Sequence, residues 1–598
     1  MLVAVLKEAF NVNRSKIIAS GGIVLSLIGF FLPSSAYFEA LAPIPVERQG
    51  HIATGILLFR ANLVFLGLIV VALAKYASRH SSPVKNDDDP AARGYGIVLV
   101  LLLVAATILR FFALNDGIWY DEVVTLVEYA QRPILEIVST YNSPNQHFLF
   151  SVLARISIVT FGEHTWSLRL PAAVFGVLSI WALYAFGRNI VGRREALLSA
   201  ALLTFSYQHL WFSQNARGYT LFLFWTILSS RYLLRGLQDN RSRDWLLYAI
   251  AATLGMYSHV TMLFVIVTHF SIYAWDLAAR RREEVRDRWA GLVIGFVFAG
   301  ALTLQLYALV VPQILFAFAQ AAEGMSGDEW TQPLWVAVEF ARGMLSNFGL
   351  VGAIVALLVA GAGVLHFARA YPRVLWLSLV PALLCLAVKF GMGHQLWPRS
   401  VFFSMGFGAV IIIRGTMLLG GEAVRMLGLK SLPPGIAGVA LSAAVVFVSA
   451  LSVPLAYGPK QDFVGARAFV AEQALPDDRV VTLGLATLPY EKLLKTDWQE
   501  VQTLAALNDV RSGARRTWLI YTLPIHIVDA YPEIVMTLES EFEVVKQFPG
   551  TLAGGTVIVC RSDIRPNGAS PRNLAGRHGQ PNRPEPQDRV DPAGQKCH

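Results

Sequence analysis

The chain has 598 residues, of which 55% are apolar and only 15% are charged, whereas an ordinary soluble domain carries roughly 25% charged residues. This imbalance excludes a typical soluble enzyme. The 50 Lys and Arg residues outnumber the 41 Asp and Glu residues, but they lie between apolar stretches and not on one basic face, so no nucleic-acid partner is indicated. The three cysteines show no spacing typical of a zinc site or a disulfide framework.

Apolar stretches of about 20 residues, long enough to cross a bilayer, recur between Ile17 and Ala456. They predict an α-helical polytopic membrane protein with about thirteen transmembrane helices. The first stretch, Ile17 to Leu32, follows several basic residues and is interpreted as an uncleaved anchor. We therefore expect an N-terminal pair of transmembrane helices with a cytoplasmic linker over residues 1–94, and the main transmembrane domain over residues 95–457.

The basic loops predict which segments face outward, because short loops rich in Lys and Arg tend to remain cytoplasmic. Seven such loops alternate regularly along the chain if the segment from His147 to Phe161 does not cross the membrane. In that segment His147, Ser151 and Arg155 form one polar stripe at i, i+4 spacing, which is typical of an interfacial helix. We expect this helix to lie flat on the outer surface of a multi-pass protein of the plasma (inner) membrane.

After residue 457 the composition returns to that of a soluble domain. Apolar, β-rich runs occur at Arg479–Leu483, Thr517–Tyr521, Phe542–Phe548 and Thr556–Cys560, with helical patterns between the first three. They predict a small α/β domain over residues 458–562 on the outer face. Residues 563–598 are rich in Pro, Gly, Arg and Asn and nearly free of apolar residues, so a disordered tail is expected.

An acidic pair, Asp121-Glu122, follows the aromatic residues Trp119 and Tyr120 at the outer end of the third apolar stretch. Aromatic side chains favour the headgroup level of a membrane, so the pair is well placed to meet a lipid-borne substrate. One carboxylate could act as a general base. The alternative is a solvated loop that caps a helix end, and an isolated Asp-Glu pair alone does not distinguish the two.

Several other segments face outward in the same topology and carry cations: Arg169, Arg217, Lys389, His394 and Arg399. Guanidinium groups bind phosphate oxygens through two charge-assisted hydrogen bonds, so a group of such cations suits a phosphate. The alternative for each residue is a side chain that snorkels at a helix end. Polar and aromatic residues of the same outward segments are candidates for positioning a substrate: Asn142, Asn145, His147, Tyr219, Tyr257 and His259.

These motifs, taken in order, resemble the polyprenyl-phosphate-dependent GT-C-type membrane glycosyltransferases, which include the protein O-mannosyltransferases and the lipid A aminoarabinose transferases. The resemblance rests on Asp121-Glu122, on the Asn-, Pro- and His-containing segment 142–147, on Arg169-Leu170-Pro171, and on Ala216-Arg217-x-Tyr219. It covers roughly residues 95–275 well and extends further by architecture. Gly218, His147-Phe148 and Ser400 depart from the pattern that is usual in the family.

The resemblance implies an inverting transfer of a single sugar from a polyprenyl-phosphate donor to a glycan, lipid or protein acceptor on the outer face of the membrane. It implies that Asp121 activates the acceptor with Glu122 as its partner and that Arg169 is an outer-loop arginine. In the reaction that we favour, the candidates for binding the donor phosphate are Arg217, Lys389, His394 and Arg399. We do not expect a cofactor to be required. Asp121, Glu122 and His394 could together bind a divalent metal, although their spacing does not demand one.

A transporter or flippase for a lipid-linked saccharide is the rival interpretation. Such proteins usually carry ionisable groups inside their spans and often contain inverted repeats. In this sequence most charges flank the apolar stretches, and we find no internal repeat. A non-catalytic membrane scaffold is a third hypothesis.

Overall fold

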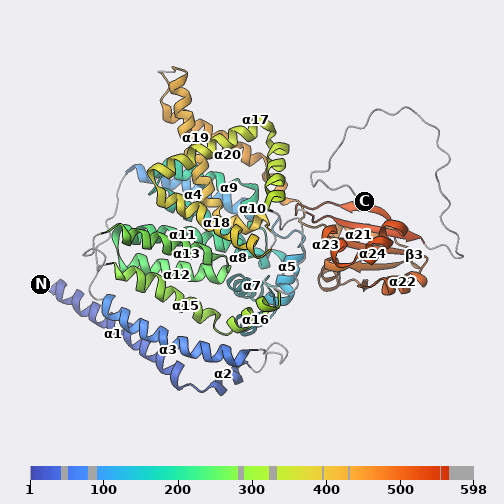
Figure 1. Ribbon diagram of the computed structural model, residues 1–598, viewed down its shortest axis with the longest axis horizontal. Coiled ribbons are helices and arrows are strands. Elements are labelled where there is room, and N and C mark those ends of the chain that lie inside the picture. Colours follow the sequence, from blue (N-terminus) through green and yellow to red (C-terminus); the bar gives the residue numbers. More distant parts are fainter. Residues whose placement is uncertain are drawn as a thin grey trace. The chain divides into compact units, whose positions relative to one another are not determined.

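The computed structural model describes residues 2–41, 51–77, 90–143, 145–280, 288–321, 333–393, 396–428, 431–552 and 554–563 (Figure 1). The chain divides into two compact units. The helical unit comprises Met1–Leu114 and Tyr129–Val453, and the sheet unit comprises Asn115–Glu128 and Pro454–His598. The segment 115–128, which the sequence analysis assigned to the transmembrane domain, thus groups with the C-terminal domain.

The helical unit consists of α-helices with short π- and 3-10-helical segments. Its elements are α1 (Leu2–Phe31), α2 (Ser34–Leu41), α3 (Ile52–Ala77), α4 (Pro90–Phe111), α6 (Ile134–Ser139), α7 (Phe148–Phe161), α8 (Thr165–Gly187), α9 (Gly192–Thr204), α10 (Tyr207–Ser213), α11 (Tyr219–Asp239), α12 (Ser242–Ser258), α13 (Met262–Ala278), η3 (Gly291–Val297), α15 (Phe298–Tyr307), α16 (Val311–Ala321), α17 (Pro333–Ala370), α18 (Pro372–Gly391), η5 (Pro398–Ser404), α19 (Met405–Met426) and α20 (Pro434–Leu451). Helices α1 and α3 run side by side (Figure 1). The long helix α17 is broken at Gly349, whose φ of 64° lies outside the helical region.

Seven helices among the described residues are long and apolar enough to cross a membrane: Ile52–Ala74, Arg93–Phe111, Thr165–Gly187, Gly349–Ala370, Pro372–Gly391, Pro398–Met426 and Pro434–Tyr457. Two bent helix pairs raise this number to nine if each pair forms one span. The prediction of a helical, multi-pass membrane protein is confirmed, but the expected number of thirteen spans is not. The difference lies mainly in the middle of the chain, where α12 and α13 have only 17 residues each and α11 carries Ser, Thr and Arg residues among its apolar ones.

The apolar stretch from Ala196 to Phe212, expected as one span, is divided into α9 and α10. Ser206 lies at the break, and its hydroxyl oxygen accepts a hydrogen bond from His209 N (3.4 Å) at the start of α10. Serine at this position favours a new helix start because its side chain satisfies one of the first-turn N–H groups. The break gives α10 its own direction and places Ser213 to Arg217 after a short, separate helix.

Helix α7 has 14 residues, which at 1.5 Å per residue gives a length of about 21 Å, shorter than the roughly 30 Å apolar layer of a bilayer. This length agrees with a helix that does not span the membrane. The polar stripe, however, faces protein and not water, because His147 and Ser151 are buried and Arg155 is half-buried. Three of the four exposed residues of α7 are apolar, namely Ile156, Val159 and Phe161, and the fourth is Thr160.

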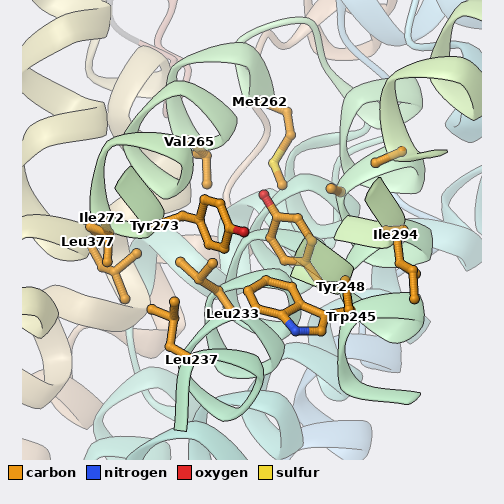
Figure 2. Packing of buried hydrophobic residues seen from close by; sticks show 14 of the residues in the cluster. Leu233, Leu237, Trp245, Tyr248, Met262, Val265, Ile272, Tyr273, Ile294 and Leu377 are labelled. Atoms are coloured by element: carbon orange, nitrogen blue, oxygen red, sulfur yellow. The ribbon is translucent and has the colours of Figure 1, made fainter. Parts of the chain in front are cut away.

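Trp245 is fully buried in a hydrophobic core of the helical unit (Figure 2). Its ring lies edge-on to the ring of Tyr273, with 5.7 Å between their centroids. The indole Nε1 donates to Asn240 Oδ1 (3.1 Å), so the one polar atom of the ring has a partner. This core joins α11, α12 and α13, and it thereby fixes the helix ends that present Tyr219 and His259.

The sheet unit contains a five-stranded mixed sheet in the order β2-β1-β3-β5-β4. Its strands are β1 (Arg479–Leu483), β2 (Gln499–Val501), β3 (Arg516–Thr522), β4 (Glu543–Phe548) and β5 (Val557–Asp563), and its C-terminal helices include α21 (Phe463–Gln473), η8 (Pro489–Leu493), α22 (Leu504–Ser512), α23 (Pro524–Ala530) and α24 (Pro532–Glu541). Strand β1 pairs in parallel with β2 and β3, while β5 pairs antiparallel with β3 and β4. The predicted small α/β domain is confirmed; only the three-residue strand β2 was missed. Residues 564–598, expected to be a disordered tail, lie outside the described residues.

Candidate functional site

The acidic pair lies on the short helix α5 (Tyr120–Val124) of the sheet unit. The two carboxylates have different surroundings. Glu122 is fully buried, and its Oε2 accepts a hydrogen bond from Trp119 N (3.4 Å) at the helix start, where backbone N–H groups need partners. Asp121 is half-buried and is therefore the more accessible carboxylate. This arrangement suits a catalytic role for Asp121 and a structural role for Glu122.

Tyr120 adjoins Asp121 on the same helix. Burial, reinforced by the nearby carboxylates of Asp121 and Glu128, raises the pKa of the Tyr120 hydroxyl above its ordinary value. The phenol therefore remains protonated at neutral pH. Tyr120 can donate a proton in a hydrogen bond but cannot itself serve as a base.

Arg217 in the helical unit follows α10 and is almost completely buried. Its Nη1 donates to the carbonyl oxygen of Asn145 (2.9 Å), and its Nη2 donates to Asn145 Oδ1 (2.6 Å). The two-pronged geometry expected of this arginine is thus present, and in this structure it binds Asn145. These bonds bring together Arg217 and Asn145, which are separated by 72 residues in sequence.

Three aromatic side chains, from His147, Tyr219 and His259, form a cluster beside this arginine. The His147 ring lies 4.9 Å from that of His259 and 5.3 Å from that of Tyr219, measured between centroids. His147 Nδ1 lies 3.2 Å from the carbonyl oxygen of Ser258; because a carbonyl only accepts, Nδ1 must carry the proton. His259 Nδ1 accepts from Thr261 N (3.1 Å), so the proton of His259 is on Nε2.

Both imidazoles are held neutral. Burial, then the charge of Arg217, lowers the pKa of His147 well below its ordinary value. Burial and the charges of Arg217, Lys389 and Arg399, in that order, lower the pKa of His259, which lies in the turn between α12 and α13, to about 3. His259 thus offers a neutral Nε2–H donor, and the charges of three cations contribute to keeping it neutral.

Three of the four cations predicted to bind phosphate therefore act on one residue, His259. Lys389 lies in the last turn of α18. Arg399 lies at the start of η5, where its guanidinium stacks 5.4 Å from the centroid of the Trp397 ring. The fourth, His394, lies outside the described residues, so its role stays a prediction.

Gly218, which stands where the family usually has proline, is required by the packing of this cluster. A Cβ atom at this position would lie 2.8 Å from His147 Nδ1 and 2.9 Å from the carbonyl oxygen of Ser258. Either contact is shorter than van der Waals packing allows. Glycine at position 218 thus allows His147 to lie close to the start of α11.

Arg169 is buried in α8, and its Nη1 donates to the carbonyl oxygen of Leu114 (3.1 Å). Leu114 is the last residue before the acidic loop, so this bond fixes the point at which the loop leaves the helical unit. Tyr257, in contrast, packs in an aromatic group with Phe148 and Tyr307. Asn142 is exposed.

Two buried residues that the sequence analysis did not select hold the segment carrying Arg217. Arg110 donates through Nη2 to the carbonyl oxygen of Thr204 (3.2 Å), at the end of α9, and approaches His209 Nδ1 of α10 to 2.7 Å. Gln214 Nε2 donates to the carbonyl oxygen of Phe112 (2.5 Å). The only sequence signal for this network was an arginine, Arg110, near the end of an apolar stretch. The partners of Arg110 are distant in sequence.

No group of three or more His, Cys, Asp and Glu side chains that could bind a metal occurs among the described residues. Since His394 is not among them, the predicted ligand set Asp121, Glu122 and His394 stays a prediction.

Residues 144–307 match the family described as dolichyl-phosphate-mannose-protein mannosyltransferase. This range contains Asn145, His147, Arg217 and His259, but not Asp121. A relative, the putative mannosyltransferase YycA of Bacillus subtilis (strain 168), is 23% identical over 229 residues, which make up 35% of this chain. The match spans about a third (31%) of the length of that relative.

Three solved structures show distant similarity. ArnT from Cupriavidus metallidurans bound to undecaprenyl phosphate has a TM-score of 0.44 and 13% identity, over 77% of this chain and 97% of that one. The Archaeoglobus fulgidus oligosaccharyltransferase has a TM-score of 0.45 and 12% identity, over 77% and 72%; arabinosyltransferase EmbB from Mycobacterium smegmatis has 0.39 and 11%, over 83% and 49%. These similarities are too distant to support an argument on their own. Over residues 144–307, however, the chain matches the dolichyl-phosphate-mannose-protein mannosyltransferase family, and its resemblance to the membrane glycosyltransferases is confirmed for that segment.

Proposed function

We propose that the chain is an inverting glycosyltransferase that moves a single sugar from a polyprenyl-phosphate donor to a glycan, lipid or protein acceptor on the outer face of the plasma membrane. The observation that carries the proposal is that the charges of Arg217, Lys389 and Arg399, together with burial, lower the pKa of His259. Arg217 and His259 belong to the segment that matches a glycosyltransferase family. Cations and an N–H donor are what a phosphate leaving group requires.

In the proposed reaction Asp121 accepts the proton of an acceptor hydroxyl while the hydroxyl oxygen attacks the anomeric carbon. The bond between that carbon and the phosphate oxygen breaks, and its electron pair remains on the phosphate. Attack from the face opposite the phosphate inverts the anomeric centre in one displacement. The leaving phosphate gains negative charge, which preorganised cations in a partly buried environment stabilise more strongly than water does.

The other predicted residues support these roles. Arg169, through Leu114, holds the base of the acidic loop, and Asn145 holds Arg217. Arg169→Ala should therefore reduce folded yield or abolish activity at every donor concentration, because it leaves the buried carbonyl of Leu114 without this donor.

The first test identifies the sugar. Mass spectrometry of lipid-linked sugars and outer-surface glycans in a deletion strain should show accumulation of one polyprenyl-phosphate sugar and loss of that sugar from an envelope component. Wild-type protein should restore the normal pattern, and Asp121→Asn should not.

The second test separates a transferase from a transporter. In detergent solution no membrane divides donor from acceptor, so a transporter causes no chemical change, whereas a transferase releases polyprenyl phosphate. Release of polyprenyl phosphate by purified wild-type protein, given the accumulated donor and the deficient envelope component, is the expected result. An unchanged donor after prolonged incubation would contradict the proposal.

The proposed topology can be tested by labelling with an impermeant maleimide in intact cells, using a background without native cysteines. Glu163 and Arg194 are both exposed and lie before and after α8. A cysteine at Glu163 should react from outside, and one at Arg194 should be protected. Labelling of the Arg194 position from outside would overturn the interfacial placement of α7 and the outer location of the acidic loop.

A further inference from the structure

The acidic loop is attached to the C-terminal domain by a side chain 341 residues away in sequence. Tyr120 N, the backbone amide directly before Asp121, donates to Gln461 Oε1 (3.0 Å). Gln461 is 3% exposed. The first N–H groups of a helix have no acceptor within the helix. Gln461, from another part of the chain, supplies an acceptor for the first N–H group of α5.

The orientation of the Gln461 amide is fixed at both ends. Its Nε2 donates to the hydroxyl oxygen of Thr522 (2.9 Å), which is fully buried at the end of β3. Rotating the amide by 180° would point its NH₂ group at the N–H of Tyr120, and two donors repel each other. Gln461 therefore presents an acceptor to Tyr120 in one orientation only.

The backbone of Gln461 is equally constrained. Thr551 and Leu552 bind the segment that leads to Gln461: Thr551 N donates to the Pro459 carbonyl oxygen (2.8 Å) and Leu552 N to that of Lys460 (3.2 Å). A Cβ at Gly550 would lie 2.1 Å from the Lys460 carbonyl oxygen, which only glycine avoids. Gln461 is thus held by the core of the domain before it meets the loop.

The acidic loop makes further contacts with the same domain. Gly117 approaches Val464 of α21 so closely that an added Cβ would be in van der Waals contact at 3.8 Å. Helix α5 packs against η8. The C-terminal domain therefore contacts the loop before and after Tyr120, and Gln461 provides the hydrogen bond between these contacts.

We propose that Gln461 is a positioning residue, through which the C-terminal domain fixes the carboxylate of Asp121 for catalysis. This inference rests on the proposed function, in which Asp121 is the general base. A base acts only at hydrogen-bond distance from the proton that it removes, and a displacement of about 1 Å can reduce turnover by roughly 100-fold. The C-terminal domain then contributes to catalysis by positioning Asp121, without contacting the substrate.

Gln461→Leu removes the acceptor and the donor at similar side-chain size. It should lower kcat by roughly 10- to 100-fold and leave the KM for the donor unchanged. Gln461→Glu retains an acceptor for Tyr120 N, and the Thr522 hydroxyl can turn to donate to it, so this variant should keep most of the activity. Gln499→Leu, the same change at an exposed position of strand β2, is the matched control and should behave as wild type.

Two measurements separate positioning from general damage to the fold. Amide hydrogen exchange of the peptide containing Tyr120 should be faster in Gln461→Leu and unchanged in Gln499→Leu. In an Asp121→Asn background, Gln461→Leu should cause no further loss of kcat, because its effect passes through Asp121. If Gln461→Leu does not fold, Thr522→Val, which removes only the hydroxyl that orients the amide, should give a smaller loss of kcat of the same kind.

Wild-type kcat in a folded Gln461→Leu protein would overturn the proposal, and so would an additive loss in the Asp121→Asn background. Equal losses in Gln461→Leu and Gln461→Glu would also contradict it. Failure of the proposed function is recognised separately: in that case Asp121→Asn itself retains normal turnover, while hydrogen exchange at Tyr120 still reports the contact with Gln461.

Discussion

The two groups of polar residues that the proposed reaction needs are built in different ways. His147, Arg217 and His259 lie at helix ends and turns of the helical unit, are held by hydrogen bonds, and belong to the segment that matches a glycosyltransferase family. Asp121 lies on a five-residue helix outside that segment, and its loop is attached to the C-terminal domain. In the proposed reaction, donor binding and base catalysis therefore depend on separate parts of the chain, so a change in one should leave the other intact.

The largest expected effect is a loss of turnover caused by a change in the acidic loop. Asp121→Asn keeps the size of the side chain but removes the base, so turnover should fall by roughly 100-fold or more. Asp116→Asn changes an exposed carboxylate of the same loop and should have little effect. Rates of polyprenyl phosphate release from purified, folded proteins provide the measurement, and near-normal turnover in Asp121→Asn would remove Asp121 from the mechanism.

The next effect tests the packing of the ring cluster. In Gly218→Ala the new Cβ would collide with His147 and with the Ser258 carbonyl, and such overpacking costs roughly 1–3 kcal/mol. The apparent melting temperature in detergent should therefore fall. Gly408→Ala, in α19, where an added Cβ has no atom within 4 Å, should show no such fall. Equal melting temperatures for the two variants would contradict the packing described for His147.

The smallest effect concerns pH. Because burial holds the pKa of His147 below its ordinary value of 6.5, the unfolded chain binds a proton that the folded chain does not as pH falls below about 6.5. The stability associated with a neutral His147 is thus fully present above that pH and is lost below it. His147→Asn keeps a donor for Ser258 but cannot titrate, so its melting temperature should fall less between pH 7.5 and pH 5 than that of wild type. His259 titrates in the same sense, so the pH dependence should be reduced and not abolished; an unchanged dependence would contradict the assignment.

Features set by local sequence were predictable. The apolar stretches lie on helices, and four of the five strands end within three residues of their expected bounds. Each of these features depends on the periodicity or length of a short run of residues. Strand β2 has only three residues and gives too little pattern to be detected.

Features set by distant contacts were not predictable. The bond from Tyr120 to Gln461 joins residues that no local pattern connects, and the break between α9 and α10 is accompanied by Arg110 from another helix. The stripe containing His147 and Ser151 was expected to mark a helix that lies flat on the outer surface, yet both side chains are buried. Its burial depends on partners such as Ser258, which are close only in the folded chain.

Donor titration of Asp121→Asn and Arg217→Lys, measured side by side with wild type, tests the separation of the two regions most directly. Arg217→Lys keeps the charge but loses the two-pronged geometry, so the donor KM should rise by about tenfold, equivalent to roughly 1.4 kcal/mol, with kcat nearly unchanged. Asp121→Asn should lower kcat and leave the donor KM near that of wild type. If both variants changed the same kinetic constant, or if Arg217→Lys left the donor KM unchanged, the division into a phosphate-binding region and a base-bearing loop would be contradicted.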